Sequence, residues 1–582
     1  MAALDSYGSS VVVGSRSNGC VYAVHLLDGS TTPGWPRCTG YGIDSTPSVY
    51  PAGPGLLDEV FVTSGDSPGQ SPAVLDAGHG SITAFGPAGN TLWSRALPDT
   101  FSTYGSSPAV FASPAIGDTG SGSPSIVVGD IGLDLYSLDP ATGANETGWP
   151  QKTADTTFAT PAIADIGGRQ TIVAASDSTA GIDALDNWNG GAVRTLDAKG
   201  QTGWTARSNE VVTSSPAVGN LEGVPAVVYG HGRYWSDLGS ASDADGLTAV
   251  NAETGATLWE EHLGGYTRGS PALADLLGNG QLDVVEATWT ALGQPTGGAV
   301  FAFGPGGNKI WGPVVPAGAG NTITGGVATA DFGEGYQDVV VATGLGFAIL
   351  DGHTGAVVDV EGQNVDWDGT YANLTMQNTP LIVPDPSGSG LDIVVAGTYM
   401  GSGDNTQGFI AAYRVGTSAF VGKGAWPMFH HDPALSGSGI APAPPPGTCL
   451  PAVPPCTAQG YLLAASDGGI FAYGDAGYHG SIGGHRLAAP IVGVAATPDG
   501  KGYWEVASDG GIFAYGDAGY HGSMGGRPLN APVVGLARTS SGAGYWEVAT
   551  DGGTFNFGDA YFRGSAGDLT LSRPVVGIGA VG

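Results

Sequence analysis

Aromatic, acidic and basic side chains gather in a few long segments that each follow a Val-rich stretch of the chain. Aromatic rings stack on the apolar faces of sugars, and neighbouring polar groups bind hydroxyl groups or charged side chains. We therefore expect a binding surface for a glycan or another protein; the alternative is that these segments are solvated or self-packed loops. The candidate ligand-binding residues are Trp188, His231, Arg233, Tyr234, Trp235, Trp289 and Tyr399.

The run around His231 also permits a catalytic interpretation. His231, Arg233 and Tyr234 would supply an acid–base pair and a positive charge, the groups that a polysaccharide lyase or hydrolase needs. No nucleophile elbow, His-Glu-x-x-His zinc motif or phosphate-binding loop accompanies them. We therefore predict no catalytic residue and keep a carbohydrate-active enzyme as the competing hypothesis.

The composition favours short strands joined by tight turns. The 582 residues include 102 Gly and 39 Pro, and only 12% are charged, so a mainly helical protein is excluded. The formal net charge of −33 repels phosphate backbones and anionic lipid surfaces. No apolar stretch is long enough to span a bilayer, and residues 1–5 lack the features of a signal peptide, so any secretory leader would precede residue 1.

Four cysteines form two locally spaced pairs, Cys20 with Cys38 and Cys449 with Cys456. Each pair could close a short loop, which favours two disulfides in an oxidising compartment. Neither pair has the additional close Cys or His residues that a zinc site requires. We therefore expect an extracellular or cell-surface protein.

Tryptophans reveal repeats in the first three quarters of the chain. Successive members are 58, 56, 55, 55 and 52 residues apart, a seventh unit (350–355) has lost its Trp, and an eighth ends at Trp426. Each unit offers four short strands, too few to bury both sheet faces, so the units must pack around an axis. We predict an all-β fold with an eight-bladed, alternatively seven-bladed, β-propeller over residues 1–438. The periodic residues are Trp35, Trp93, Trp149, Trp204, Trp259 and Trp311.

The first unit lacks the Ser/Thr-Pro-Ala phrase that opens the others. We expect the segment after Trp426 to supply the missing strand and so close the ring. His430 and His431 lie in that segment, where packing and capping account for them better than chemistry does.

The segment Val250–Trp259 carries an Asn-Ala-Glu-Thr-Gly-x-x-x-Trp phrase, which resembles the quinoprotein-like (PQQ-like) propeller repeat; other units resemble the FG-GAP (VCBS-type) family. The second resemblance implies calcium loops rich in alternating oxygen ligands. The nearest match carries Asp275, Asn279 and Asp283 but has Leu277 at a ligand position, so no cofactor is required and calcium is a weak expectation. A quinone-dependent dehydrogenase would need adjacent cysteines, which this chain lacks.

Beyond a Pro-rich linker (439–457), residues 458–582 contain three 42-residue repeats beginning at Gly460, Gly502 and Gly544. They resemble tandem repeats of secreted actinobacterial proteins. The closing segment 574–580 matches 490–496 and 532–537, yet no copy precedes Tyr461. We expect this strand to complete the first repeat, giving a trefoil-like or small propeller-like domain; alternatively it completes a partner chain. The repeated Tyr478, His479, Tyr520 and His521 either bind sugar or pack as turn residues.

These patterns favour a secreted or cell-surface protein that binds or scaffolds without catalysis. The expected partner is an extracellular glycan or protein, with cell adhesion as one role, and nucleic acid is not expected. A third hypothesis is a structural subunit that self-assembles into an extracellular filament or surface layer.

Overall fold

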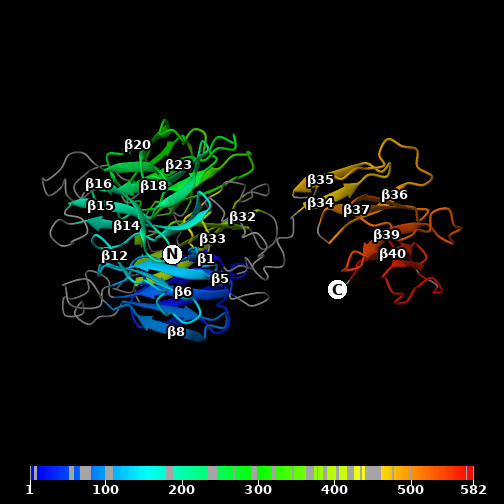
Figure 1. Cartoon of the computed structure of the whole chain (residues 1–582), viewed down its shortest axis with the longest axis horizontal. Helices are drawn as coiled ribbons and strands as arrows, with labels where there is room; N and C mark the ends of the chain where they lie inside the picture. Colours follow the sequence, from blue (N-terminus) through cyan, green and yellow to red (C-terminus); the bar gives the residue numbers. More distant parts are fainter. Residues whose placement is uncertain are drawn as a thin grey trace. The chain divides into compact units, whose positions relative to one another are not determined.

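A computed structural model describes most of the chain (Figure 1). The described residues are 2–4, 10–16, 18–51, 58–65, 80–98, 109–178, 188–232, 245–267, 269–289, 298–316, 323, 325–343, 346–361, 373–375, 378–384, 390–400, 406–415, 425, 427–432, 435–438, 460–474, 477–498, 500–569, 571 and 573–580. They divide into two compact units, Met1–Thr448 and Cys449–Gly582. Among the residues described, no helix is long and apolar enough to cross a bilayer.

The described part of the first unit consists of antiparallel sheets. The first four sheets contain β1 (Ala2–Leu4), β2 (Ser10–Gly14), β3 (Cys20–His25) and β4 (Arg37–Cys38); β5 (Ser48–Pro51), β6 (Asp58–Ser64), β7 (Ser81–Phe85) and β8 (Thr91–Ala96); β9 (Ala115–Asp118), β10 (Pro124–Gly129), β11 (Asp134–Leu138) and β12 (Gln151–Lys152); and β13 (Ala162–Ile166), β14 (Arg169–Ser178), β15 (Gly190–Leu196) and β16 (Thr202–Ser208).

The next four sheets continue the same pattern with small variations. They contain β17 (Ala217–Leu221), β18 (Val224–His231), β19 (Gly246–Asn251) and β20 (Thr257–His262); β21 (Tyr266–Thr267), β22 (Ala272–Ala274), β23 (Asp283–Trp289), β24 (Val300–Phe303) and β25 (Lys309–Val314); β26 (Val327–Ala330), β27 (Asp338–Ala342), β28 (Phe347–Leu350) and β29 (Val357–Glu361); and β30 (Asn373–Thr375), β31 (Leu381–Pro384), β32 (Leu391–Met400) and β33 (Thr406–Val415).

The innermost strands of these sheets contact one another in a closed circle. The circle runs β1, β5, β9, β13, β17, β22, β26 and β31, and β31 contacts β1 again. Sheets that are arranged radially around a central axis, with their innermost strands next to one another, form a β-propeller. The predicted all-β propeller is therefore confirmed at this level.

Burial explains why the strands differ in composition. The Val-rich β27 is buried along its whole length, because neighbouring sheets cover both of its faces. The outermost strands β8 and β20 instead alternate between exposed and half-buried residues. Each strand type therefore carries the residue pattern that its distance from the axis requires.

The periodic tryptophans join consecutive sheets, as predicted for packing residues. The indole Nε1 of Trp93 donates to the Pro140 carbonyl oxygen over 2.7 Å, and that of Trp204 donates to Ala252 over 2.7 Å. In each case the acceptor lies in the turn before the outermost strand of the next sheet. Trp35, Trp149, Trp259 and Trp311 make the corresponding bonds.

A second set of bonds links the sheets nearer the axis. The backbone N–H of Ser113 donates to Thr160 Oγ1 over 3.0 Å, and that of Thr160 donates to Ser215 Oγ over 2.9 Å. The same link joins Thr46 to Ser113 and Gly326 to Thr379. The hydroxyl of the Ser/Thr-Pro-Ala phrase therefore connects neighbouring sheets, a role that its repetition alone did not reveal.

The predicted closure of the ring by the segment after Trp426 is wrong. The first sheet obtains its innermost strand from β1, whose Ala3 pairs with Val12 of β2. Residues 427–432 and 435–438 instead run across the inner strands of distant sheets. The Pro427 carbonyl accepts the N–H of Ile382, and the Ser436 and Gly437 carbonyls accept those of Ile163 and Val218. This crossing segment satisfies inner-strand amides that have no partner within their own sheets.

His430 lies within the crossing segment and is fully buried. Its Nδ1 lies 2.7 Å from the Leu435 carbonyl oxygen, as expected for a donated hydrogen bond. Burial lowers the pKa of His430 to about 4, although the Leu435 carbonyl opposes that shift. The imidazole is therefore neutral and serves packing, as its position in the sequence indicated.

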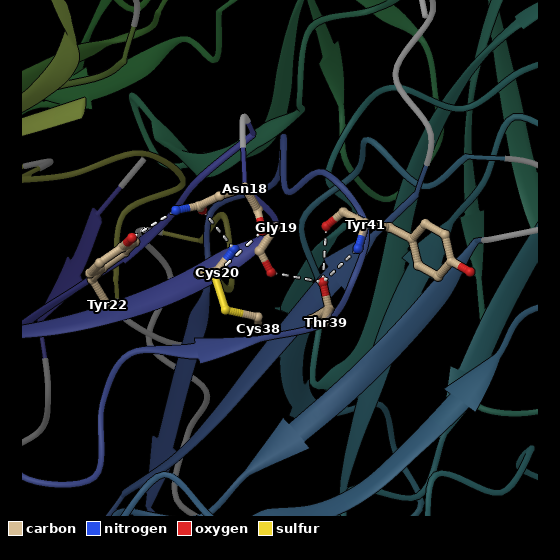
Figure 2. Close-up of a disulfide and its surroundings, with 7 residues drawn as sticks. All are labelled: Asn18, Gly19, Cys20, Tyr22, Cys38, Thr39 and Tyr41. Carbon is tan, nitrogen blue, oxygen red and sulfur yellow. Dashed lines mark hydrogen bonds between the residues drawn. A yellow bond between two sulfur atoms is a disulfide. The ribbon is translucent and has the colours of Figure 1, made fainter. Parts of the chain in front are cut away.

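The disulfide predicted between Cys20 and Cys38 is present and joins β3 to β4 (Figure 2). The two residues are direct register partners, with Cα atoms 3.8 Å apart. Figure 2 also shows the Thr39 hydroxyl bonded to the carbonyl oxygens of Gly19 and Tyr41, which fixes the chain beyond β4. Cys449 and Cys456 lie outside the described residues, and their pairing stays a prediction.

The second unit contains one sheet from each repeat. The sheets are β34 (Gly460–Ala464) with β35 (Ile470–Gly474); β36 (Ile491–Ala496), β37 (Gly502–Ala507) and β38 (Ile512–Gly516); and β39 (Val533–Arg538), β40 (Gly544–Ala549) and β41 (Thr554–Gly558). Tyr503 and Trp504 of β37 and Tyr545 of β40 are buried between the sheets. β36 contacts β34 on one side and β39 on the other, so the repeats follow one another in chain order.

Candidate functional site

The candidate surface is built where the second strands of three neighbouring sheets end. His231 is the last residue of β18 and Trp289 the last of β23, while Trp188 lies just before β15, which pairs with β14. Antiparallel connections that leave the same strand position in each blade emerge on the same face of a propeller. The repeat therefore places these three predicted residues on one face.

A continuous series of contacts connects the two tryptophans of this face. Trp188 Nε1 donates to the Ser208 carbonyl oxygen over 2.9 Å, at the end of β16. The next link is made by Gly232, whose N–H donates to the Val211 carbonyl over 3.0 Å. Gly232 in turn lies directly against the ring of Tyr266.

Tyr266 completes the series, because its ring centroid lies 5.4 Å from that of Trp289. β21 pairs Tyr266 with Trp289 and so fixes the two rings as cross-strand neighbours. Trp188 is 37% exposed, and Tyr266 and Trp289 are half-buried. We call Trp188, Tyr266 and Trp289 the aromatic face; it presents ring surface to solvent from two sheets, the fourth and the sixth.

His231 supports this face from inside rather than reaching out from it. Its side chain is 1% exposed, and Nε2 lies 2.9 Å from Thr248 Oγ1 of β19 and 3.8 Å from Glu260 Oε1. The His231 carbonyl oxygen accepts the hydroxyl of Thr267, which follows Tyr266. The imidazole is thus held within its own sheet, while the main-chain carbonyl of His231 links β18 to β21. The imidazole is poorly placed to exchange protons with a polysaccharide in solution.

Buried carboxyl groups lie close to the aromatic face. Burial and the negative charge of Asp155 raise the pKa of Asp177 to about 7, against the effect of the hydrogen bond that Thr156 donates. Glu286 is fully buried in β23, its Oε1 accepts the N–H of Ala287 over 2.9 Å, and burial raises its pKa well above the ordinary value. Burial therefore disfavours the charged form of Glu286.

The predicted calcium residues lie together around one turn, with Asp283 at the start of β23. Both carboxylate oxygens of Asp275 accept backbone N–H groups, from Asn279 over 2.9 Å and from Gly280 over 2.8 Å. Asn279 Oδ1 accepts the N–H of Gln281 over 2.9 Å. Burial, reinforced by the nearby charge of Asp275, raises the pKa of Asp283 to about 7. The side-chain oxygens thus bind the turn's own amides, and calcium binding stays a prediction.

Within the described part of the chain, no group of three or more His, Cys, Asp or Glu residues is arranged to hold a metal ion. Arg233, Tyr234 and Trp235 lie outside the described residues. Tyr399 belongs to β32, but its side chain also lies outside the description.

Two residues escaped prediction: Tyr266 of the aromatic face and the buried Glu286 close to it. Glu286 had a detectable signal, because it interrupts a Val-rich strand where the corresponding strand at 338–341 reads Asp-Val-Val-Val. Tyr266 belongs to the two-residue strand β21, which pairs with the far end of β23 as β30 pairs with the far end of β32 in the eighth sheet. Nothing in the repeat pattern marked it.

A second aromatic row lies on the C-terminal unit. Tyr478, Tyr520 and Phe562 occupy equivalent positions of the three repeats and are 62%, 63% and 60% exposed. The adjacent His521 is held in place, because its N–H donates to Tyr545 Oη over 3.1 Å and its ring contacts that of Trp504. Packing thus accounts for His521, whereas Tyr478 and Tyr520 keep their rings exposed.

No family model and no curated protein sequence matches this chain. Among solved structures, BamB from Moraxella catarrhalis is 16% identical over 71% of this chain and 92% of its own, with a TM-score of 0.42. The V. cholerae biofilm matrix protein Bap1 is 14% identical over 61% and 85%, with a TM-score of 0.33. The computationally designed Ika8 protein is 12% identical over 69% and 93%, with a TM-score of 0.42. At these values the similarities assign neither a family nor a function.

Proposed function

We propose that this protein is a secreted or cell-surface binding and scaffold protein without catalytic activity, whose ligand is a glycan or another protein. The observation that carries the proposal is the aromatic face, in which contacts between main-chain and ring atoms connect Trp188 to Trp289 across three sheets. Rings held rigidly by neighbouring sheets offer a preorganised surface that loses little conformational entropy on binding.

The proposed architecture is an eight-bladed propeller followed by a small propeller-like domain. Eight innermost strands in one circle support the blade number. Successive three-stranded sheets in the second unit favour a propeller-like over a trefoil-like arrangement. The exposed row of Tyr478, Tyr520 and Phe562 gives this domain a second adhesive surface.

The proposed extracellular location rests on the disulfide. A disulfide such as Cys20–Cys38 persists in oxidising compartments and is rare in the cytosol.

The net charge of −33 disfavours nucleic acids and anionic lipids as partners. Neutral glycans and basic protein surfaces remain favourable ligands.

A glycan array probed with the full chain tests the proposal. We expect binding that Trp188→Ala and Trp289→Ala each weaken about 5- to 150-fold, because each substitution removes stacking area worth roughly 1–3 kcal/mol. Leu258→Ala, which removes a comparably exposed apolar side chain elsewhere on the propeller, serves as the control. If both tryptophan variants bind like the control, the aromatic face is not the binding site.

The bound glycan should remain intact. Incubation of that glycan with the protein, followed by assays for new reducing ends and unsaturated sugars, addresses the competing enzyme hypothesis. Sustained turnover that the Trp188→Ala variant loses would replace the binding proposal with catalysis on the same face.

A further inference from the structure

The first sheet of the C-terminal unit lacks a strand that its neighbours possess. β36 pairs with β37 and β39 pairs with β40, so the second and third repeats each begin with an inner strand. Among the described residues, β34 pairs with β35 alone. The preceding linker contains Pro454 and Pro455, which have no N–H to contribute to a β-ladder.

The segment 574–580 has the sequence of the missing strand and is already held in the corresponding place. The Val575 N–H donates to the Thr550 carbonyl oxygen over 2.9 Å. The same bond joins Ile491 to Ser466 over 3.0 Å and Val533 to Ser508 over 2.9 Å, at the start of β36 and β39. The third repeat therefore carries the inner strand of a further sheet.

This strand has no ladder partner among the parts of the chain that the structure describes. Within the described residues, 573–580 pair with no strand, and Val576 is 87% exposed. Gly577 packs against Gly535 just as Gly535 packs against Gly493, so the backbone is aligned with the earlier inner strands. An aligned strand with unpaired backbone groups is a template for another chain.

The complementary apolar surface lies on the first repeat. Leu463 of β34 and Phe471 of β35 face each other across the ladder and are 51% and 54% exposed. Their counterparts in the second repeat, Glu505 and Phe513, are buried and half-buried. The β34–β35 sheet and the segment 574–580 thus each expose a surface whose counterparts in the second repeat are covered by a neighbouring strand.

We propose that residues 574–580 of one chain complete the β34–β35 sheet of a second copy of this chain, and that two copies exchange these strands reciprocally. This inference goes beyond the binding function proposed for the propeller. The register follows from the complete sheets, in which Val494 pairs with Glu505. Because the repeats are 42 residues long, Ile578 corresponds to Val494 two repeats earlier, and Leu463 corresponds to Glu505 one repeat later. Ile578 of one chain should therefore lie opposite Leu463 of the other.

A second copy fits better than closure within one chain. Radial arrays of blade-like sheets close with four to eight members, so three sheets are too few and the six of two chains suffice. Reciprocal exchange gives a two-fold dimer, which is the commonest symmetric assembly. It also removes both open edges of the array at once.

Cysteine cross-linking of the full chain tests the register. Leu463→Cys and Ile578→Cys are made in separate chains, mixed, partly denatured and refolded together, and oxidised. We expect a covalent dimer from the mixture and none from either variant alone. Phe471→Cys mixed with Ile578→Cys is the matched control and should give none, because Phe471 lies on the far strand of the sheet.

A chain that carries both Leu463→Cys and Ile578→Cys separates the alternatives. Disulfides between chains support exchange; disulfides within chains, with no dimer from the mixture, overturn it. Light scattering of the wild-type full chain should give the mass of two chains, and Ile578→Pro should give one. A wild-type monomer at tens of micromolar concentration would also overturn the proposal. Glycan-array binding of the Ile578→Pro monomer reports separately on the aromatic face.

Discussion

Gly255 lies directly against the indole ring of Trp204 in the preceding sheet, so that a Cβ atom added to it would approach ring atom Cδ2 to 2.8 Å. Its φ of 71° also lies in the left-handed region. The same contact recurs at three other junctions, between Gly143 and Trp93, Gly307 and Trp259, and Gly355 and Trp311. The turn and the tryptophan of adjacent sheets therefore constrain each other.

We predict that Gly255→Ala lowers the free energy of unfolding of the propeller by about 2–4 kcal/mol, combining backbone strain with displacement of the Trp204 ring. Gly223→Ala provides the matched control, because Gly223 has a φ of 84° but open space where the Cβ would lie. It should cost only about 1 kcal/mol. Denaturant titration of both variants measures the difference, and equal losses would show that ring contact contributes nothing.

The disulfide permits a second test, which measures how much the covalent bond to β4 stabilises the first sheet. β4 has only two residues and both are exposed, so few contacts retain it besides the Cys20–Cys38 bond. We predict that the double substitution Cys20→Ser and Cys38→Ser lowers the free energy of unfolding by about 2–4 kcal/mol. Thermal unfolding without reductant compares it with wild type. Unchanged melting would mean that the outer strand is dispensable for stability.

Repetition made the propeller predictable, because burying thin sheets against similar neighbours leaves few other solutions. The Trp spacing and the Val-rich strands identified the blades and assigned the tryptophans to their junctions. Closure of the ring was predicted wrongly because β1 consists of Ala2–Leu4, three residues without the Ser/Thr-Pro-Ala phrase. Strand pairing there is decided by proximity in the folded ring, which no local pattern records.

The candidate site was predictable only in part for a related reason. Trp188, His231 and Trp289 follow Val-rich strands, and that position places them on one face. Whether a side chain then points outward depends on local pairing: His231 turns inward to Thr248, while Tyr266 reaches the face from an irregular strand. Sequence position therefore predicted the face but not the exposure of its members.

The crossing segment permits a test of how the propeller centre is held. Leu435 is fully buried in a cluster that includes Val11 of β2, Val49 of β5 and Leu381 of β31. We predict that Leu435→Ala costs about 2–5 kcal/mol, because it leaves a cavity on the propeller axis. Leu27→Ala, at a position 74% exposed, should change stability by less than about 0.5 kcal/mol. Equal effects in denaturant titration would indicate that the segment packs loosely.

The turn at Asp275 allows a structural role of the Asp275 carboxylate to be distinguished from calcium binding. Because both carboxylate oxygens of Asp275 accept backbone N–H groups, we predict that Asp275→Ala costs about 1–2 kcal/mol and that millimolar calcium or chelator leaves the melting temperature of the wild type unchanged. Differential scanning calorimetry with and without calcium measures both effects. A calcium-dependent rise in melting temperature that Asp283→Asn abolishes would establish the weaker alternative, a calcium loop.

Two buried glutamates should make the C-terminal unit sensitive to pH. Burial, with a smaller effect of the nearby Asp509 charge, raises the pKa of Glu547 to about 8, and burial likewise raises that of Glu505 to about 7. Both side chains are fully buried. Unfolding exposes them to water and returns each pKa to the ordinary value near 4.5.

Between about pH 4.5 and pH 8 the folded state binds protons that the unfolded state has released. The stabilising contribution of these protons is therefore complete below about pH 4.5 and is lost as the pH rises toward about 8. We predict that the free energy of unfolding of this unit falls between about pH 5 and pH 8, by a few kcal/mol at most. Glu547→Gln should flatten that slope because the amide stays neutral. Asp568→Asn, which alters an exposed carboxylate of the same unit, should leave it unchanged. Tryptophan fluorescence during denaturation at several pH values measures the slope, and a rise in stability with pH would contradict the assignment.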